Sequence, residues 1–179
     1  MKTTIALVAF TLLVPVAASA QGARINLSAL DRLAERATEK QEITIDSMML
    51  KTAGQALVPS GRNAEAAKQI LSELEGVYVR SYEFDDPKAY SMDDVNPIRK
   101  QLTAPGWTRV VVNEEKGRDG DWELQEIWLF NPGGKIGGIF IINAERNELQ
   151  IINIVGPIDL NKLGGLGGIF GIPHNIGIN

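Results

Sequence analysis

The chain has 179 residues, and 18 Lys and Arg against 22 Asp and Glu give it a formal net charge of −4. Hydrophobic residues make up 44% of the chain, which together with its length favours one globular domain and excludes a disordered chain. The absence of Cys and the single histidine, His174, exclude disulfide scaffolds, thiol enzymes and metal sites built from several Cys or His, and the mild acidity argues against nucleic acid as a partner.

The first twenty residues have the pattern of a secretory signal peptide. Lys2 precedes an apolar stretch over residues 5–16, and Ala18-Ser19-Ala20 forms a small-residue cleavage signal. This apolar stretch is too short to span a membrane, which needs about 20 apolar residues. The alternative to a signal peptide is therefore a buried N-terminal helix. We therefore expect cleavage between Ala20 and Gln21 and export to the periplasm or out of the cell, with no transmembrane segment in the mature chain.

Helical patterns dominate the next part of the chain. Apolar residues recur there at helical spacing behind capping residues, and two short segments alternate at period two, as strands do. The predicted helices span residues 26–40, 47–57, 64–75 and 93–102, with Asn63 as the cap and Gly76 as the terminating glycine of the third, and the predicted strands span residues 41–46 and 77–84.

Four consecutive strands are predicted after Pro105-Gly106. They span residues 107–113, 122–130, 136–143 and 149–155, and the short polar connections between them are typical of hairpins. Helices early and strands late predict an α+β fold, with N-terminal helices packed on a largely antiparallel sheet that ends in a four-strand meander. We expect one domain over residues 21–163, which ends in a short helix near residues 160–163 and is followed by a Gly-rich tail over residues 164–179.

The late strands are apolar on both faces. In the strand over residues 122–130, Leu124 and Trp128 lie on one face and Ile127 and Leu129 on the other. In a meander with one face exposed to solvent, apolar and polar side chains should alternate along each strand. These strands do not alternate in this way, so something must cover the second face. The N-terminal helices and the C-terminal tail are the favoured covers, and a partner subunit or an apolar ligand is the alternative.

Glu126 is the acidic residue that invites a functional interpretation. It shares a strand face with Leu124, Trp128 and Phe130, where burial would raise its pKa and make it a candidate general acid. The favoured alternative is a structural ion pair with Arg109 or Arg80, because lone buried acids more often pair than catalyse.

No motif in the sequence carries recognisable chemistry. There is no G-x-S-x-G sequence, the glycines around Lys135 do not fit a phosphate loop, and the carboxylates of residues 119–123 do not fit a calcium loop. We therefore predict no catalytic residues, no cofactor and no metal ligands.

Six segments of the chain together carry a likeness to a known family. They are residues 77–84, 105–107, 137–139, 153–156, 158–160 and 171–173. These segments resemble the exported bacterial proteins classed as domain of unknown function 4252, and the likeness covers about residues 30–173. The resemblance implies an exported domain at the cell envelope and no assigned activity. Many relatives have the features of lipoproteins, and this chain departs from them because it has no Cys.

The leading hypothesis is an exported, non-catalytic binding or interaction module of the periplasm or cell envelope. Its partner would be a protein or a small apolar ligand, and a homodimer is also open. The alternatives are a carboxylate-dependent exported hydrolase, with Glu126 as its acid, and a subunit of an envelope assembly that uses the tail as an interaction arm.

Overall fold

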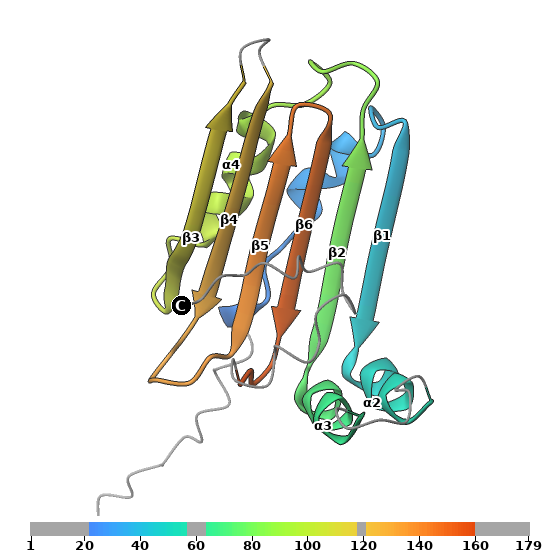
Figure 1. Ribbon diagram of the computed structural model, residues 1–179, viewed down its shortest axis with the longest axis vertical. Coiled ribbons are helices and arrows are strands. Elements are labelled where there is room, and N and C mark those ends of the chain that lie inside the picture. The colour runs from blue at the N-terminus through green and yellow to red at the C-terminus, as the bar shows by residue number, and fades with distance from the viewer. Residues whose placement is uncertain (1–21, 57–63, 118–120, 160–179) are drawn as a thin grey trace, which may run out of the picture.

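The computed structural model describes residues 22–56, 64–117 and 121–159, through which runs an antiparallel sheet of six strands (Figure 1). The strands stand in the order β1-β2-β6-β5-β4-β3, so the last four form a meander and β6 also pairs with β2. This arrangement confirms the α+β class and the C-terminal meander. The strands are β1 (Glu39–Asp46), β2 (Gly76–Glu83), β3 (Trp107–Lys116), β4 (Trp122–Phe130), β5 (Gly138–Glu145) and β6 (Glu148–Val155).

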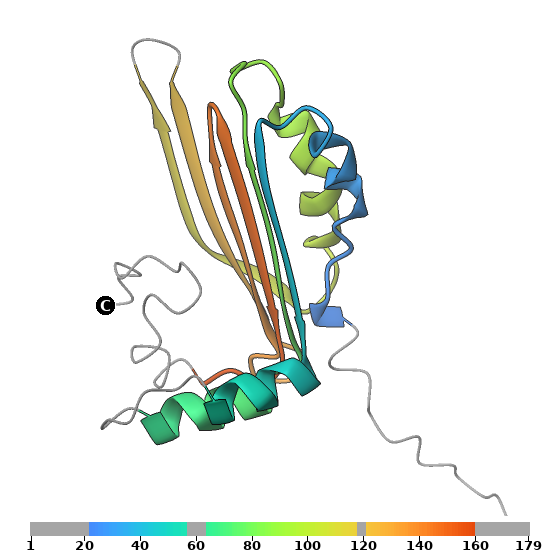
Figure 2. The same cartoon turned by 90° about the vertical axis from the view of Figure 1, so that its right-hand side faces the viewer.

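Short helices lie against one face and one end of the sheet (Figure 2). The 3₁₀ helix η1 (Ser28–Leu33) and α4 (Met92–Gln101) cover one face. The pair α2 (Ser47–Ala56) and α3 (Ala64–Glu73) crosses the end where β1 finishes and β2 starts, and extends toward the opposite side. We call the side under η1 and α4 the helix face, and the opposite side the banded face.

Both faces of the sheet contribute to a hydrophobic core, as the two-sided apolar strands predicted. On the helix face, Tyr82, Phe140 and Ile151 pack with apolar side chains of η1 and α4. On the banded face, the sheet residues pack with Leu50, Ile70, Leu71 and Leu74 from α2, α3 and the residue after α3. None of the described helices is long and apolar enough to cross a membrane.

The first predicted helix is shorter and tighter than expected. In place of a helix over residues 26–40, η1 has six residues, and β1 starts at Glu39. Leu27, Leu30 and Leu33 are all buried at a spacing of three, which matches the three residues per turn of a 3₁₀ helix. The strand starts early because the Thr38 amide donates to the Glu83 carbonyl, which begins the pairing of β1 with β2.

The prediction that Gly76 terminates the third helix is wrong. The helix α3 ends at Glu73, and Gly76 is the first residue of β2. A side chain at this position would meet the ring of Tyr78, with the nearest atom 2.7 Å from its Cβ, so the glycine is needed for packing.

Several predictions fall on residues outside the described ranges. These are the signal peptide and its cleavage site after Ala20, the cap Asn63, the short helix at residues 160–163 and the tail over residues 164–179. The other elements agree with their predicted positions to within about three residues.

Candidate functional site

Glu126 lies at the centre of a charged cluster under α4. Its side chain is 0% exposed, and its two oxygens accept four hydrogen bonds. Arg99 of α4 donates from Nη2 at 2.7 Å and from Nε at 3.2 Å, Arg109 of β3 donates from Nη1 at 2.8 Å, and Trp128 donates from Nε1 at 3.0 Å. The cluster therefore joins α4 to the sheet.

The surroundings of Glu126 keep it ionised. Burial alone would raise its pKa, but the hydrogen bonds from Trp128, Arg99 and Arg109 together hold the pKa below its ordinary value. A general acid needs a raised pKa and a proton to donate, and this carboxylate has neither. Of the two partners considered from sequence, Arg109 is present, whereas Arg80 lies 3.6 Å from Glu42. The pairing with Arg99 was missed because that residue comes from a separate helix.

The banded face is organised in rows that cross all six strands. The register of each strand pair places one residue from every strand side by side in a row. The type of side chain differs from one row to the next along the strand direction. Two of the rows, the aliphatic rows, lie nearest to α2 and α3. They consist of Ile45, Val77, Ile154, Ile139, Leu129 and Thr108, and of Ile43, Val79, Ile152, Ile141, Ile127 and Val111.

Next along the strands comes a polar row, which we call the amide row. Its members are Gln41, Ser81, Gln150, Asn143, Gln125 and Asn113. Four of them form a hydrogen-bonded chain, in which Asn113 donates to Gln125, Gln125 to Asn143 and Asn143 to Gln150, at 3.4, 3.1 and 3.1 Å. A carboxamide has two donor hydrogens and an acceptor oxygen, so the amides within this chain keep donors and acceptors for another molecule.

The last row consists of glutamate in every strand, and we call it the glutamate row. Its members are Glu39, Glu83, Glu148, Glu145, Glu123 and Glu115, of which Glu145 and Glu148 flank the two-residue turn between β5 and β6. All six are exposed, and none forms an ion pair within the described part of the chain. At about 4.8 Å between strands, the row is roughly 24 Å long.

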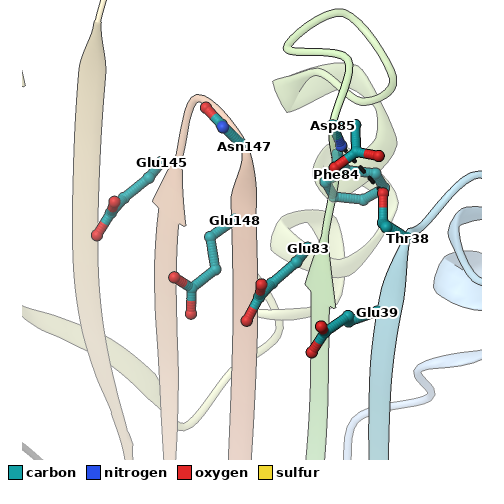
Figure 3. A pocket seen from close by; sticks show the side chains of 8 residues that line it. All are labelled: Thr38, Glu39, Glu83, Phe84, Asp85, Glu145, Asn147 and Glu148. Carbon is teal, nitrogen blue, oxygen red and sulfur yellow. Dashed lines mark hydrogen bonds between the residues drawn. The ribbon is translucent and has the colours of Figure 1, made fainter.

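The four members of the glutamate row nearest to the β1 edge border a groove of about 420 Å³ (Figure 3). Glu39, Glu83, Glu148 and Glu145 line it from four adjacent strands, and Figure 3 shows their side chains standing side by side. Thr38, Phe84, Asp85 and Asn147 complete the lining.

The backbone around this groove is held in place from the helix face. The buried Tyr90 hydroxyl donates to the carbonyls of Glu145 and Glu148, the latter at 2.7 Å. The Phe84 amide donates to the Asn147 carbonyl at 2.9 Å, which ties β2 to the same turn. These hydrogen bonds connect the strand ends that carry Glu83, Glu145 and Glu148.

The carboxylates of the glutamate row repel one another, and no cationic side chain of the described residues pairs with them. Burial raises the pKa of Glu148, and the neighbouring carboxylates Glu145 and Glu83 raise it further. Like charges directly opposite each other across strands destabilise a sheet. No described group of His, Asp or Glu converges closely enough to hold a metal ion, because the carboxylates follow a line.

Sequence reasoning did not find the glutamate row, although each member was visible. Every strand has a glutamate at one end or one residue in from it, but their alignment depends on the registers of pairs such as Glu39 with Glu83, which are 44 positions apart. Of the carboxylates of residues 119–123 that were considered for a calcium loop, Glu123 belongs to the row.

Comparison with known proteins identifies a family. The model described as Domain of unknown function (DUF4252) matches residues 35–166, which include the whole sheet. No curated protein and no solved structure matches the chain.

Proposed function

This chain belongs to the DUF4252 family, and we propose that it is an exported binding domain that holds a cationic peptide segment of a partner protein along the glutamate row and the amide row. The observation that carries the proposal is the glutamate row itself. Six exposed carboxylates without a cationic partner in the described structure exceed the net charge of −4 of the whole chain.

A cationic partner removes the repulsion that the fold maintains. Isolated exposed charge pairs contribute little, about 0.2–1 kcal/mol each, but six carboxylates held in a line act together on one extended polycation. Their summed field also steers a cation to the surface and speeds association. The aliphatic rows are for the most part buried in the core, so the glutamate and amide rows are the accessible part of the banded face.

The amide row favours a peptide over a simple cation. It runs beside the glutamate row, two residues away along each strand, or about 7 Å. Its free carboxamide donors and acceptors complement the carbonyls and amides of a peptide backbone, whereas a metal ion or a polyamine has no carbonyl to receive them. A Lys- or Arg-rich segment lying across the strands can use both rows together.

We also propose export with cleavage after Ala20, on the signal-peptide pattern of the first twenty residues, and the contacts of the described residues nearest to that site are compatible with it. The Asn153 side chain accepts from the Ile25 amide and donates to the Ala23 carbonyl, and the Trp107 indole donates to the Gly22 carbonyl. The fold therefore uses the chain from the second residue after the proposed cleavage site onward. The mature protein that starts at Gln21 keeps all of these contacts.

Titration calorimetry of the mature protein, residues 21–179, with hexalysine tests the proposal. We expect binding at low ionic strength that weakens as salt is added, because the attraction is between exposed charges. The triple substitution of Glu83, Glu145 and Glu148 by Gln should weaken binding about tenfold, the combined effect of three pairs at roughly 0.5 kcal/mol each.

A second triple variant is the matched control. It replaces Glu35, Glu75 and Glu114, which lie outside the glutamate row, by Gln and so changes the net charge equally. Equal weakening in the two variants would show that only overall charge matters, and no binding of hexalysine at low salt would overturn the cationic partner. Spermine, which has four charges but no peptide groups, should bind more weakly than tetralysine of the same net charge; equal binding would refute a role for the amide row.

A further inference from the structure

The two edges of the sheet are built differently. The outer strand β3 has a β-bulge between Arg109 and Val111, an irregularity that protects an edge from pairing with another strand. The outer strand β1 pairs with β2 over all eight residues without a bulge. In Figure 1 no described helix runs along its outer side, and its residues are exposed or half-buried. Its unpaired backbone groups are therefore open to another strand.

The apolar rows of the banded face stop abruptly at β1. In the row of Ile43, the next residue, Val79, is only 7% exposed, and in the row of Ile45 the next residue, Val77, is fully buried. Ile43 and Ile45 themselves remain half-buried. A further strand beside β1 would cover them and continue the sheet.

The charges of β1 favour pairing with β1 of a second copy, and they favour one register of that pairing. In an antiparallel pair of identical strands with Ile43 opposite Ile43, Lys40 faces Asp46 twice, and Gln41 and Glu42 face Ile45 and Thr44. Shifting by two residues along one strand places Glu42 opposite Glu42 or opposite Asp46, which like-charge repulsion disfavours. Glu39 falls outside the paired segment, so the two glutamate rows stay apart.

We propose that the protein forms a two-fold symmetric dimer in which β1 pairs antiparallel with β1 of a second copy, with Ile43 opposite its counterpart. The pairing is isologous, so it closes at two copies. It joins the two sheets into one of twelve strands and leaves both glutamate rows accessible at opposite ends. One strand pair buries less than a standard interface, so the dimer is weak and reversible. The inference does not depend on the proposed function.

Cysteine cross-linking tests the register, because the natural chain has no Cys. Opposite residues in an antiparallel pair have Cβ atoms about 4.5–5.5 Å apart, which an oxidant can bridge with small adjustment. The mature Ile43→Cys variant should give a covalent dimer on mild oxidation. Gln41→Cys and Ile45→Cys should each remain monomeric alone and cross-link when mixed. Cross-linking of Gln41→Cys by itself, or none in any sample, would overturn the register.

Sedimentation equilibrium of the unmodified mature protein tests the dimer without a new thiol. We expect a concentration-dependent dimer, and a monomer at the highest soluble concentration would refute the proposal. Lys40→Asp should weaken the dimer about tenfold, because two attractive pairs become repulsive. Lys135→Asp, the same charge change in the β4–β5 loop, should leave the dimer unchanged; equal weakening would indicate a charge effect alone. Asp46 is kept because it caps α2 by accepting from the Met49 amide.

Discussion

Replacing Glu126 by Gln separates the structural role of this buried carboxylate from a catalytic one. The substitution keeps the shape of the side chain but removes its negative charge. One of the two oxygens becomes an NH₂ group, which faces a guanidinium N–H or the Trp128 indole N–H, all of them donors. Each oxygen accepts two of the four hydrogen bonds, so two are lost, and two positive charges remain without a counter-charge.

The geometry sets the size of the effect. Removing one partner of a fully buried ion pair costs about 3–5 kcal/mol. Here Glu126 is fully buried, but the side chains of Arg99 and Arg109 are 33% and 41% exposed and can take up water when the carboxylate is gone. We therefore discount the cost for solvent screening and expect a loss of about 2–3 kcal/mol in the free energy of unfolding.

Urea unfolding of the mature protein, followed by tryptophan fluorescence, measures this loss. Glu114→Gln is the control, because Glu114 forms an exposed pair with Lys116 and should lose less than about 0.5 kcal/mol. In a double-mutant cycle with Arg109→Met, the two effects should be non-additive, since both changes remove the same interaction.

The pH dependence of the free energy of unfolding is an independent test of the role of this cluster. Because the folded-state pKa of Glu126 is lowered, its stabilising contribution is present above the unfolded pKa of about 4.3 and is lost as the pH falls through the folded value. The difference between wild type and Glu126→Gln should thus be constant near neutral pH and shrink in acid. A loss below 0.5 kcal/mol at neutral pH, or a difference that grows on acidification, would refute the ion-pair account.

Three further substitutions probe other parts of the fold by the same urea assay. Glu148→Gln should raise the free energy of unfolding by about 0.5–1 kcal/mol at pH 7. Burial, and to a smaller extent repulsion from its glutamate neighbours, raises the pKa of Glu148. The wild type therefore regains stability as the pH falls through that pKa, and the free energies of unfolding of the two proteins should converge below about pH 4. Parallel curves of stability against pH would contradict this. Asn153→Leu should cost about 2–3 kcal/mol and speed hydrogen exchange of the Ile25 amide, which loses its buried acceptor; unchanged protection would contradict the anchor. Gly106→Ala should cost about 1–3 kcal/mol, because its φ is +98° and the new Cβ would lie 2.7 Å from a phenylalanine ring. Gly133→Ala, with a φ of +81° and open space around it, isolates the backbone part of that cost, and an equal loss in both would rule out the ring contact.

Local patterns were sufficient for most of the elements. Short apolar segments bounded by polar connections located all six strands, because strand propensity and turn composition are local properties of the chain. The face that Glu126 shares with Trp128 also followed from alternation. The helix over residues 26–40 was overestimated because a spacing of three at Leu27, Leu30 and Leu33 is compatible with α and 3₁₀ geometry alike, and the tie between Thr38 and Glu83 ends the helical region early.

Long-range strand pairing, and not any local pattern, sets which residues lie side by side. Sequence patterns predicted the two-sided apolar sheet but not the row of glutamates. The order of the strands, with β6 between β2 and β5, and the register across α2 and α3 placed the glutamates in one row and brought Arg99 from α4 to Glu126. Arg99 and Glu126 are 27 positions apart and Glu83 and Glu148 are 65 apart, so no local propensity specifies these contacts. They arise because a shift by one residue would turn the aliphatic rows out of the core, so burial of apolar surface fixes the register that the charged rows then share.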